Sequence, residues 1–133
     1  MKTSLANIVA YTTLDGSTIR ELIHPLVHGN WAQSLAEATI PPLGQTLLHR
    51  HLVSEEIYHV SAGTGWVWMG DRWLAVRPGD SICIAPGTAH CAKADRHGPL
   101  VILCCCSPAY SHDDTELLDT TVPPAPNPNE DKQ

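Results

Sequence analysis

The apolar residues of this chain come in short runs, and this feature restricts the fold more than any other. Segments of roughly four to eight residues rich in Leu, Ile and Val alternate with Gly and Pro. That length suits a strand, whereas an ordinary helix needs a longer uninterrupted run. About eight to ten such segments at regular spacing predict an antiparallel β-sandwich or barrel.

Turn residues set the expected boundaries of the strands. Gly70 and Asp71 stand between two of them and predict a hairpin. Ser111 is placed to cap a short helix after the last strand. The strongest strand candidates are residues 17–24, 34–40, 45–51, 55–62, 65–69, 72–76, 80–85 and 99–106.

The length of 133 residues suits one domain, and a hydrophobic content of 43% is enough for a real core. Residues 1–33 are expected to form an N-terminal strand segment and residues 34–106 the body of the barrel. Residues 107–121 read as a C-terminal extension. Residues 122–133 hold four prolines among polar residues and are expected to be disordered or loosely draped.

The distribution of charge excludes some partners. The net charge is −6, but most of it belongs to the acidic residues after His112. No basic stripe is present, which argues against a nucleic-acid partner. No run approaches the roughly 18 apolar residues of a membrane span, and no signal peptide is visible. The five cysteines, three of them consecutive, do not suggest a disulfide framework, so we expect reduced thiols and a cytoplasmic protein.

One group of polar residues carries the chemistry. His49 and His51 are two apart in an expected strand and therefore project from the same face. The next strand brings two glutamates, Glu55 and Glu56, on opposite faces. If the two strands pair antiparallel, one of these glutamates meets the histidines across the ladder. His90, after a Pro-Gly turn, can return to the same interior.

Three neutral imidazoles and one carboxylate suit a divalent first-row metal such as Mn, Fe, Co, Ni, Cu or Zn. Four protein ligands leave one or two positions open on an octahedral ion, as a catalytic site requires. The alternative is an ordinary strand that carries histidines without a metal. The downstream glutamate and the distant histidine favour the metal site.

The two histidine motifs resemble those of the cupins. The sequence His49-Arg50-His51 is followed after four residues by Glu56, and six residues later by Gly63. The second motif begins at Gly79 and ends in Pro86-Gly87-Thr88-Ala89-His90. Ala85 and Ala94 depart from the family pattern, as does the position of Gly44. None of these is a metal ligand in the family.

The resemblance implies an all-β cupin double-stranded β-helix, or jelly-roll β-barrel, of six to eight strands. It assigns the metal ligands to His49, His51, Glu56 and His90, with Glu55 as the second choice. It also implies a metal-dependent enzyme that acts on a small organic substrate, with dioxygenase (oxidoreductase) chemistry first. A lyase or isomerase and a non-catalytic binding module are the alternatives. Single-domain cupins often pair, so a homodimer is expected.

Other residues close in sequence to these motifs have a functional and a structural alternative. Tyr58 shares a face with Glu56 and is the candidate catalytic residue for proton transfer, or a half-buried structural tyrosine. Cys104 and Cys106 share one strand face, either as small core residues or as thiols near the metal. Tyr110 is a candidate lid over the mouth. The expected apolar walls of the pocket are Leu35, Leu47, Ile82, Ile84 and Ile102.

Overall fold

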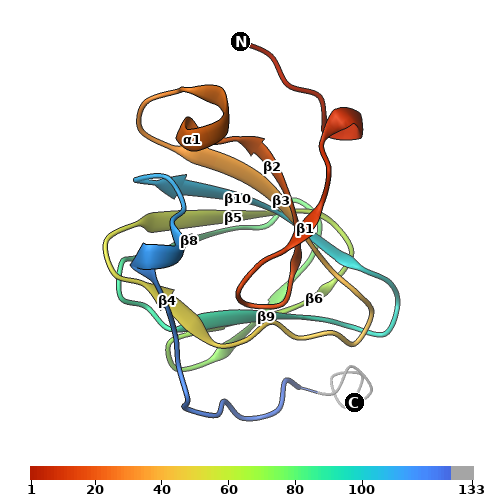
Figure 1. Cartoon of the computed structure of the whole chain (residues 1–133). Helices are drawn as coiled ribbons and strands as arrows, with labels where there is room; N and C mark the ends of the chain where they lie inside the picture. The colour runs from red at the N-terminus through yellow and green to blue at the C-terminus, as the bar shows by residue number, and fades with distance from the viewer. Residues whose placement is uncertain (127–133) are drawn as a thin grey trace.

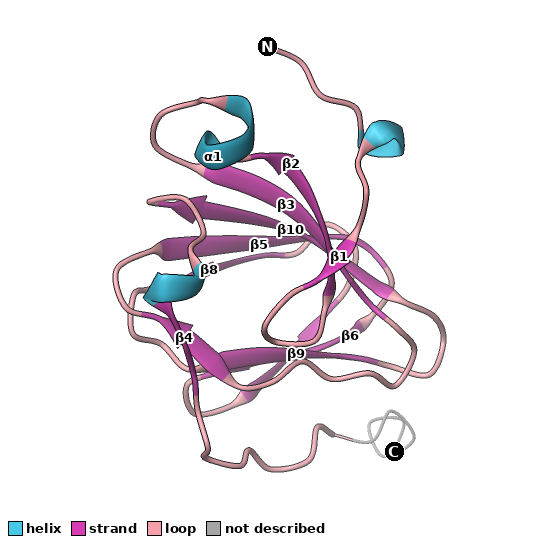
Figure 2. Ribbon diagram, viewed as in Figure 1, coloured by secondary structure: helices cyan, strands magenta, loops and turns pink. Residues whose placement is uncertain are grey.

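The computed structural model describes residues 1–126 and shows two antiparallel β-sheets that face each other (Figures 1 and 2). The six-stranded sheet has the order β1-β2-β3-β10-β5-β8. Its strands are β1 (Tyr11–Thr12), β2 (Thr18–Ile23), β3 (Ser34–Ile40), β10 (Leu100–Ser107), β5 (Glu55–Ala62) and β8 (Ser81–Ile84).

The second sheet has five strands in the order β11-β4-β9-β6-β7. Its strands are β11 (Thr115–Leu117), β4 (His49–His51), β9 (His90–Ala94), β6 (Gly65–Met69) and β7 (Trp73–Val76). Helical structure in the described part of the chain is limited to α1 (Pro25–His28) and two 3-10 turns, η1 (Leu5–Asn7) and η2 (His112–Asp114). No helix in residues 1–126 is long and apolar enough to cross a membrane.

Strict alternation of side chains builds the interior. In β3 the even-numbered residues Ser34, Ala36, Ala38 and Ile40 are buried, while the odd-numbered residues between them are partly exposed. In β5 the residues Glu56, Tyr58 and Val60 are buried in the same way. Because successive residues of a strand point to opposite faces, each strand presents one face to the space between the sheets.

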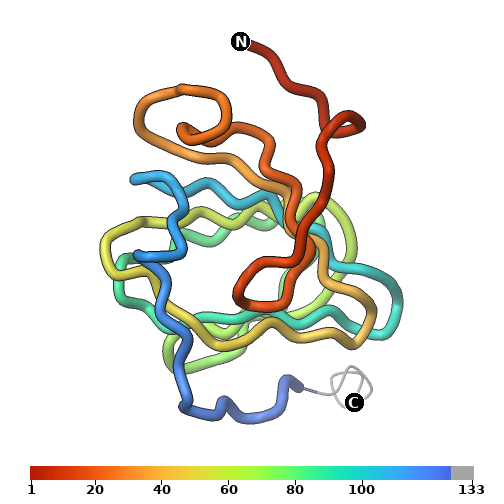
Figure 3. The backbone as a smooth tube through the Cα atoms, viewed as in Figure 1, coloured from red at the N-terminus to blue at the C-terminus, as the bar shows by residue number. Residues whose placement is uncertain are grey.

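The N-terminal and C-terminal segments of the chain each bridge the two sheets. The β1–β2 hairpin reaches from the six-stranded sheet to the other, where the Leu47 amide donates to the Asp15 carbonyl at 2.8 Å. At the opposite end of the sequence, the segment after β10 crosses between the sheets and adds β11 to the edge of β4 (Figure 3). Both terminal segments therefore lie next to the interior that holds the histidines.

Most of the predicted strands are present, including the hairpin at Gly70. The strand expected over 45–51 is shorter and begins at His49. Ser111 caps a 3-10 turn, because its hydroxyl accepts from the Asp113 amide. The eight predicted strands correspond to β2 to β8 and β10, whereas β1, β9 and β11 were not predicted. Residues 127–133 of the proline-rich tail lie outside the described residues.

Candidate metal centre

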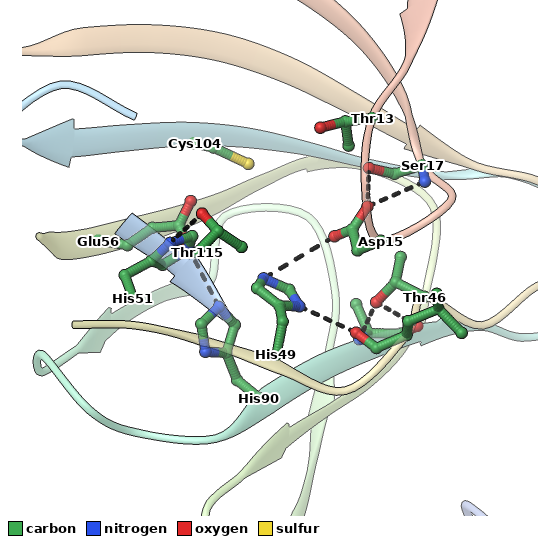
Figure 4. Close-up of polar contacts among 12 residues, drawn as sticks. Thr13, Asp15, Ser17, Thr46, His49, His51, Glu56, His90, Cys104 and Thr115 are labelled. Atoms are coloured by element: carbon green, nitrogen blue, oxygen red, sulfur yellow. Dashed lines mark hydrogen bonds and ion pairs between the residues drawn. The ribbon is translucent and has the colours of Figure 1, made fainter. Parts of the chain in front are cut away.

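Four side chains meet between the sheets: His49, His51, Glu56 and His90. All four are buried, and one ligand atom from each lies within 4.8 Å of the others. The Glu56 Oε1 atom is 3.1 Å from His51 Nε2 and 3.2 Å from His90 Nε2 (Figure 4). Ligand atoms on one ion with bonds of about 2.1 Å lie roughly 3.0–3.4 Å apart, so these separations fit a shared metal.

The four residues reach this point from opposite sheets. His49 and His51 lie on β4, and His90 lies directly opposite His49 on the paired strand β9. Glu56 lies on β5, which belongs to the other sheet and pairs with β8 and β10. The expectation that the histidine strand pairs with the glutamate strand is therefore wrong. The carboxylate meets the imidazoles across the sandwich, not along a ladder.

Backbone carbonyls fix the orientation of two of the imidazoles. His49 Nδ1 is 2.9 Å from the Leu47 carbonyl, and His90 Nδ1 is 2.8 Å from the Thr88 carbonyl. A carbonyl can only accept, so Nδ1 must carry the proton in each ring. The neutral ring then presents the Nε2 lone pair to the site, as a metal ligand must.

A side chain fixes the third imidazole. His51 Nδ1 lies 3.0 Å from the Thr115 hydroxyl, which donates its own proton to the Ser111 carbonyl at 2.8 Å. With that proton committed, Thr115 accepts from His51 Nδ1 and again leaves Nε2 as the free donor atom. Thr115 belongs to β11, so the C-terminal extension is part of the site.

The Glu56 carboxylate is held at its second oxygen as well. The Cys106 thiol donates to Glu56 Oε2 at 3.3 Å, which leaves Oε1 for the centre of the cluster. Burial acts to raise the pKa of Glu56, but its close contacts with the His51 and His90 rings outweigh burial and bring the pKa below its ordinary value. Glu56 is therefore present as a carboxylate, and its contact raises the pKa of Cys106, which burial has already raised.

The protonation of the cluster favours a metal ion at its centre. Burial, with the neighbouring His90, lowers the pKa of His49 to about 4, so this ring is neutral at pH 7. Three lone pairs and one carboxylate oxygen then converge on one point, which is a repulsive arrangement unless a cation lies between them. The donor set of three imidazoles and a carboxylate fits a first-row transition metal, and the ligand atoms do not distinguish which one.

A cavity of about 50 Å³ adjoins the four ligands. One water needs about 10–15 Å³, so there is room for several waters or a small organic group. Of the five expected apolar wall residues, Ile102 lines it, whereas Leu35, Leu47, Ile82 and Ile84 do not, and Leu47 is 53% exposed. The other walls come from β2, β3, β10 and the two terminal segments; the lining includes Thr13, Asp15, Ile19, Glu21, Ala36, Ala38, Thr46, Tyr58, Ala92, Cys104, Cys106 and Tyr110.

Tyr58, the predicted catalytic residue, lines this cavity beside the metal ligands. It lies two residues after Glu56 on the inner face of β5, and its ring contacts His90 edge-on with centroids 5.8 Å apart. Burial, and then the charge of Glu56, raises the pKa of Tyr58. Its phenol therefore keeps its proton at neutral pH and can donate it to a bound molecule.

Two cysteines and Tyr110 also lie at the cavity. Cys104 and Cys106 both line the cavity, as their shared face predicted, while Cys105 points away toward Gln33. Tyr110 lies at the cavity wall, where its hydroxyl bonds Thr13 at 3.2 Å across the mouth. The cysteines are all free.

Asp15 was not anticipated. It lies in the turn of the β1–β2 hairpin, and its Oδ2 atom faces His49 Nε2 at 3.9 Å (Figure 4). Its Oδ1 atom accepts from the amide and the hydroxyl of Ser17 at 3.0 and 2.6 Å. The Asp15-Gly16 pair was a turn signal in the sequence, although the observed loop between β1 and β2 has five residues and the contact with His49 had no local signal.

The sequence matches a known protein family and a relative of similar length. The family model described as a cupin domain matches residues 36–106, just over half of the chain. An uncharacterised protein of Methanocaldococcus jannaschii, MJ1618, is 46% identical over 119 residues, which cover 90% of this chain and 95% of that protein.

Solved structures share the fold at low sequence identity. The polyketide cyclase RemF from Streptomyces resistomycificus is 20% identical with a TM-score of 0.77, and the match covers 91% of this chain and 87% of that one. A predicted oxalate decarboxylase from Thermotoga maritima is 19% identical with a TM-score of 0.72, covering 81% and 99%. The Streptomyces nucleoside dehydratase Pac13 is 13% identical with a TM-score of 0.69, covering 89% and 90%.

Proposed function

The chain belongs to the cupin domain family, and from that premise we propose that it is a metal-dependent enzyme acting on a small organic substrate. The observation that carries the proposal is the buried cluster of His49, His51, Glu56 and His90 beside a cavity. On an ion that takes five or six ligands, four ligands from the chain leave one or two positions for a substrate, and the adjoining cavity gives the substrate room to reach them. A bound divalent metal would supply Lewis acidity or a centre for oxygen chemistry.

The residues around the cavity favour non-oxidative proton transfer as the reaction class. Tyr58 presents a protonated phenol beside the metal ligands and is the group we assign to proton donation. A lyase, isomerase or dehydratase needs such an acid. The structural neighbours include a cyclase, a predicted decarboxylase and a dehydratase, which is compatible with this choice although their likeness to this chain lies in the fold alone.

Dioxygenase chemistry is the second candidate. The three imidazoles and one carboxylate are also a ligand set that holds iron, copper or manganese for oxygen chemistry. The two candidates differ in one measurement, because a dioxygenase consumes O₂ in proportion to substrate and a lyase or isomerase consumes none. A third possibility is a binding module without turnover.

The first experiment is elemental analysis of the protein as purified, together with the His51→Ala and Glu56→Ala variants. We expect about one metal ion per chain in the wild type and loss of most of it in both variants, while far-UV circular dichroism shows an intact β-rich fold. Glu55→Ala is the matched control, because Glu55 lies on the exposed face of the same strand. Unchanged metal content in the Glu56 variant would contradict the ligand assignment.

The second experiment tests the role of Tyr58 once a substrate is found. Tyr58→Phe removes only the hydroxyl, so it should lower kcat by about 10²–10⁴-fold with the metal retained. The same samples are followed with an oxygen electrode. Full turnover in the Phe variant would exclude proton transfer by Tyr58, and O₂ uptake that is stoichiometric with substrate would select the dioxygenase.

A further inference from the structure

One carboxylate in the cavity has no role in holding the metal. Glu21 lies on β2, on the same inner face as the cavity walls, and lines the cavity. Its Oε2 atom accepts a hydrogen bond from the Tyr11 hydroxyl at 3.1 Å. Its Oε1 atom is buried and has no hydrogen-bond partner among the described residues. A buried acceptor without a partner is costly, so it indicates a group that the protein alone does not supply.

The register of the sheet shows where Glu21 lies relative to the metal centre. Glu21 is opposite Ala36 on β3, which is opposite Cys104 on β10, which is opposite Tyr58 on β5. These side chains form one row across the sheet, and the metal ligand Glu56 lies two residues from the end of that row. Neighbouring strands are about 4.8 Å apart, so Glu21 and Tyr58 are separated by three such steps.

The residues between Glu21 and Tyr58 have small side chains. Ala36 and Cys104 are small, and Ala38 in the adjacent row is small as well. Larger side chains at these positions would fill the space between the sheets. The small side chains therefore leave space between the metal ligands and Glu21, and an elongated ligand can lie along this row.

The formal charges that line this cavity have one sign when histidine is counted as neutral, although His24, His28 and His112 lie near Glu21. Asp15, Glu21 and Glu56 all contribute carboxyl groups to the cavity lining, and no Lys or Arg of the described chain is found there. A divalent ion at the four ligands would leave one negative charge uncompensated when all three are ionised. Burial, more than any other cause, raises the pKa of Glu21, and a cation beside it would offset that effect.

We propose that the substrate of the metal-dependent activity proposed above carries an oxygen donor at one end, for the metal, and a protonated amine at the other, for Glu21. The amine donates a charge-assisted hydrogen bond to the free Oε1 atom and neutralises the remaining charge of the cavity. Tyr11 and Tyr110 line the same end and offer aromatic surface to the cation. A dianionic substrate finds no Lys or Arg in the lining, so the metal is the one permanent positive charge available to it among the described residues. This inference rests on the proposed function and narrows it to one substrate class.

The test uses the zinc-loaded full chain, since zinc has no redox chemistry and can take a fifth ligand beside the four from the chain, and three matched series of probes. They are straight-chain amino alcohols of two to six carbons, the diols of the same lengths, and the ω-hydroxy acids. Dissociation constants are measured by isothermal titration calorimetry near pH 7. We expect the best amino alcohol to bind at least about tenfold more tightly than the best member of either other series.

The Glu21→Gln variant should abolish this preference while it retains zinc and the fold. Glu55→Gln is the matched control, because it removes the same charge from the exposed face of β5 and should leave the preference unchanged. The inference is overturned if hydroxy acids or diols bind best, if no series binds, or if Glu21→Gln keeps the wild-type preference.

Failure of the metal centre is recognised separately from failure of the substrate class. Zinc content is measured before the titrations, and one zinc per chain with a preference for anions contradicts only the amine. If zinc does not bind, the proposed function fails. In that case the same titrations on the metal-free chain test amine binding by Glu21 alone. If the metal-free chain does not prefer the amino alcohols, the assignment of Glu21 as the amine site is overturned as well.

Discussion

Thr115 should control metal affinity although it is not a ligand. Its hydroxyl accepts from His51 Nδ1 at 3.0 Å and donates to the Ser111 carbonyl. Replacing it with Val keeps the shape of the side chain and removes the acceptor. The buried N–H of His51 then has no partner, or the ring shifts its proton to Nε2 and loses the lone pair that binds the metal.

The size of the effect follows from the hydrogen bond that is lost. An unsatisfied buried N–H costs about 1–3 kcal/mol, and loss of a partner behind a metal-bound histidine typically lowers metal affinity about 10–100-fold. A 100-fold change corresponds to about 2.8 kcal/mol, so the two ranges agree. We therefore expect Thr115→Val to raise the Kd for zinc by about one to two orders of magnitude.

The assay is a competition titration of the metal-free protein against a chromophoric zinc chelator. Thr115→Ser restores the hydroxyl and should recover most of the affinity. Thr121→Val is the matched control on the exposed part of the same segment. The segment itself should stay in place, because the Leu118 amide still donates to the Leu48 carbonyl at 3.0 Å. A Kd for Thr115→Val within twofold of the wild type would refute the reasoning.

Three further predictions concern pH, the thiol and assembly. In the metal-free chain, folded His49 takes up a proton only below about pH 4, whereas the unfolded ring does so below about 6.5. Stability should therefore rise with pH across this window, by at most ~3 kcal/mol, and flatten in His49→Gln; urea titrations at several pH values that show no slope would contradict this. Cys106→Ala should raise the zinc Kd several-fold because Glu56 loses a donor, and Cys106→Ser should restore it; equal affinities in the same chelator titration would remove the thiol from the site. Trp31 is 95% exposed and Leu26 91%, so Trp31→Ser should convert the expected homodimer to a monomer in light scattering, and an unchanged dimer would move the interface elsewhere.

The ligand positions could be predicted from the sequence because local periodicity decides them. Two histidines two residues apart must share a face of a strand, and Glu56, Tyr58 and Val60 share another for the same reason. The inner faces of the two sheets then meet, whichever strands are neighbours within each sheet. Pairing itself is non-local, and neighbouring strands most often pair. Here the turn before β5 carries the chain from one sheet to the other, and the Asp114 carboxylate of η2 accepts from the Val53 and Ser54 amides of that turn at 2.8 and 3.0 Å.

The missed parts of the site lack a local signal. Strand β9 is the sequence HCAKA, which has small residues and a nearly continuous run of buried positions, and it lies in the middle of its sheet. It therefore shows no alternation of apolar and polar side chains. Thr115 and Asp15 are far in sequence from the ligands and reach them only through the closure of the two terminal segments. Their roles depend on tertiary contacts that periodicity does not encode.

The most direct measurement is X-ray absorption at the metal edge of the protein as purified. Three imidazoles, one carboxylate and open positions filled by water predict a shell of nitrogen and oxygen near 2.0–2.2 Å, with the outer-shell scattering of about three histidine rings. A sulfur shell near 2.3 Å would place Cys106 or Cys104 on the metal in place of Glu56. A sample without metal, or with an ion that shows no histidine scattering, would contradict the central claim.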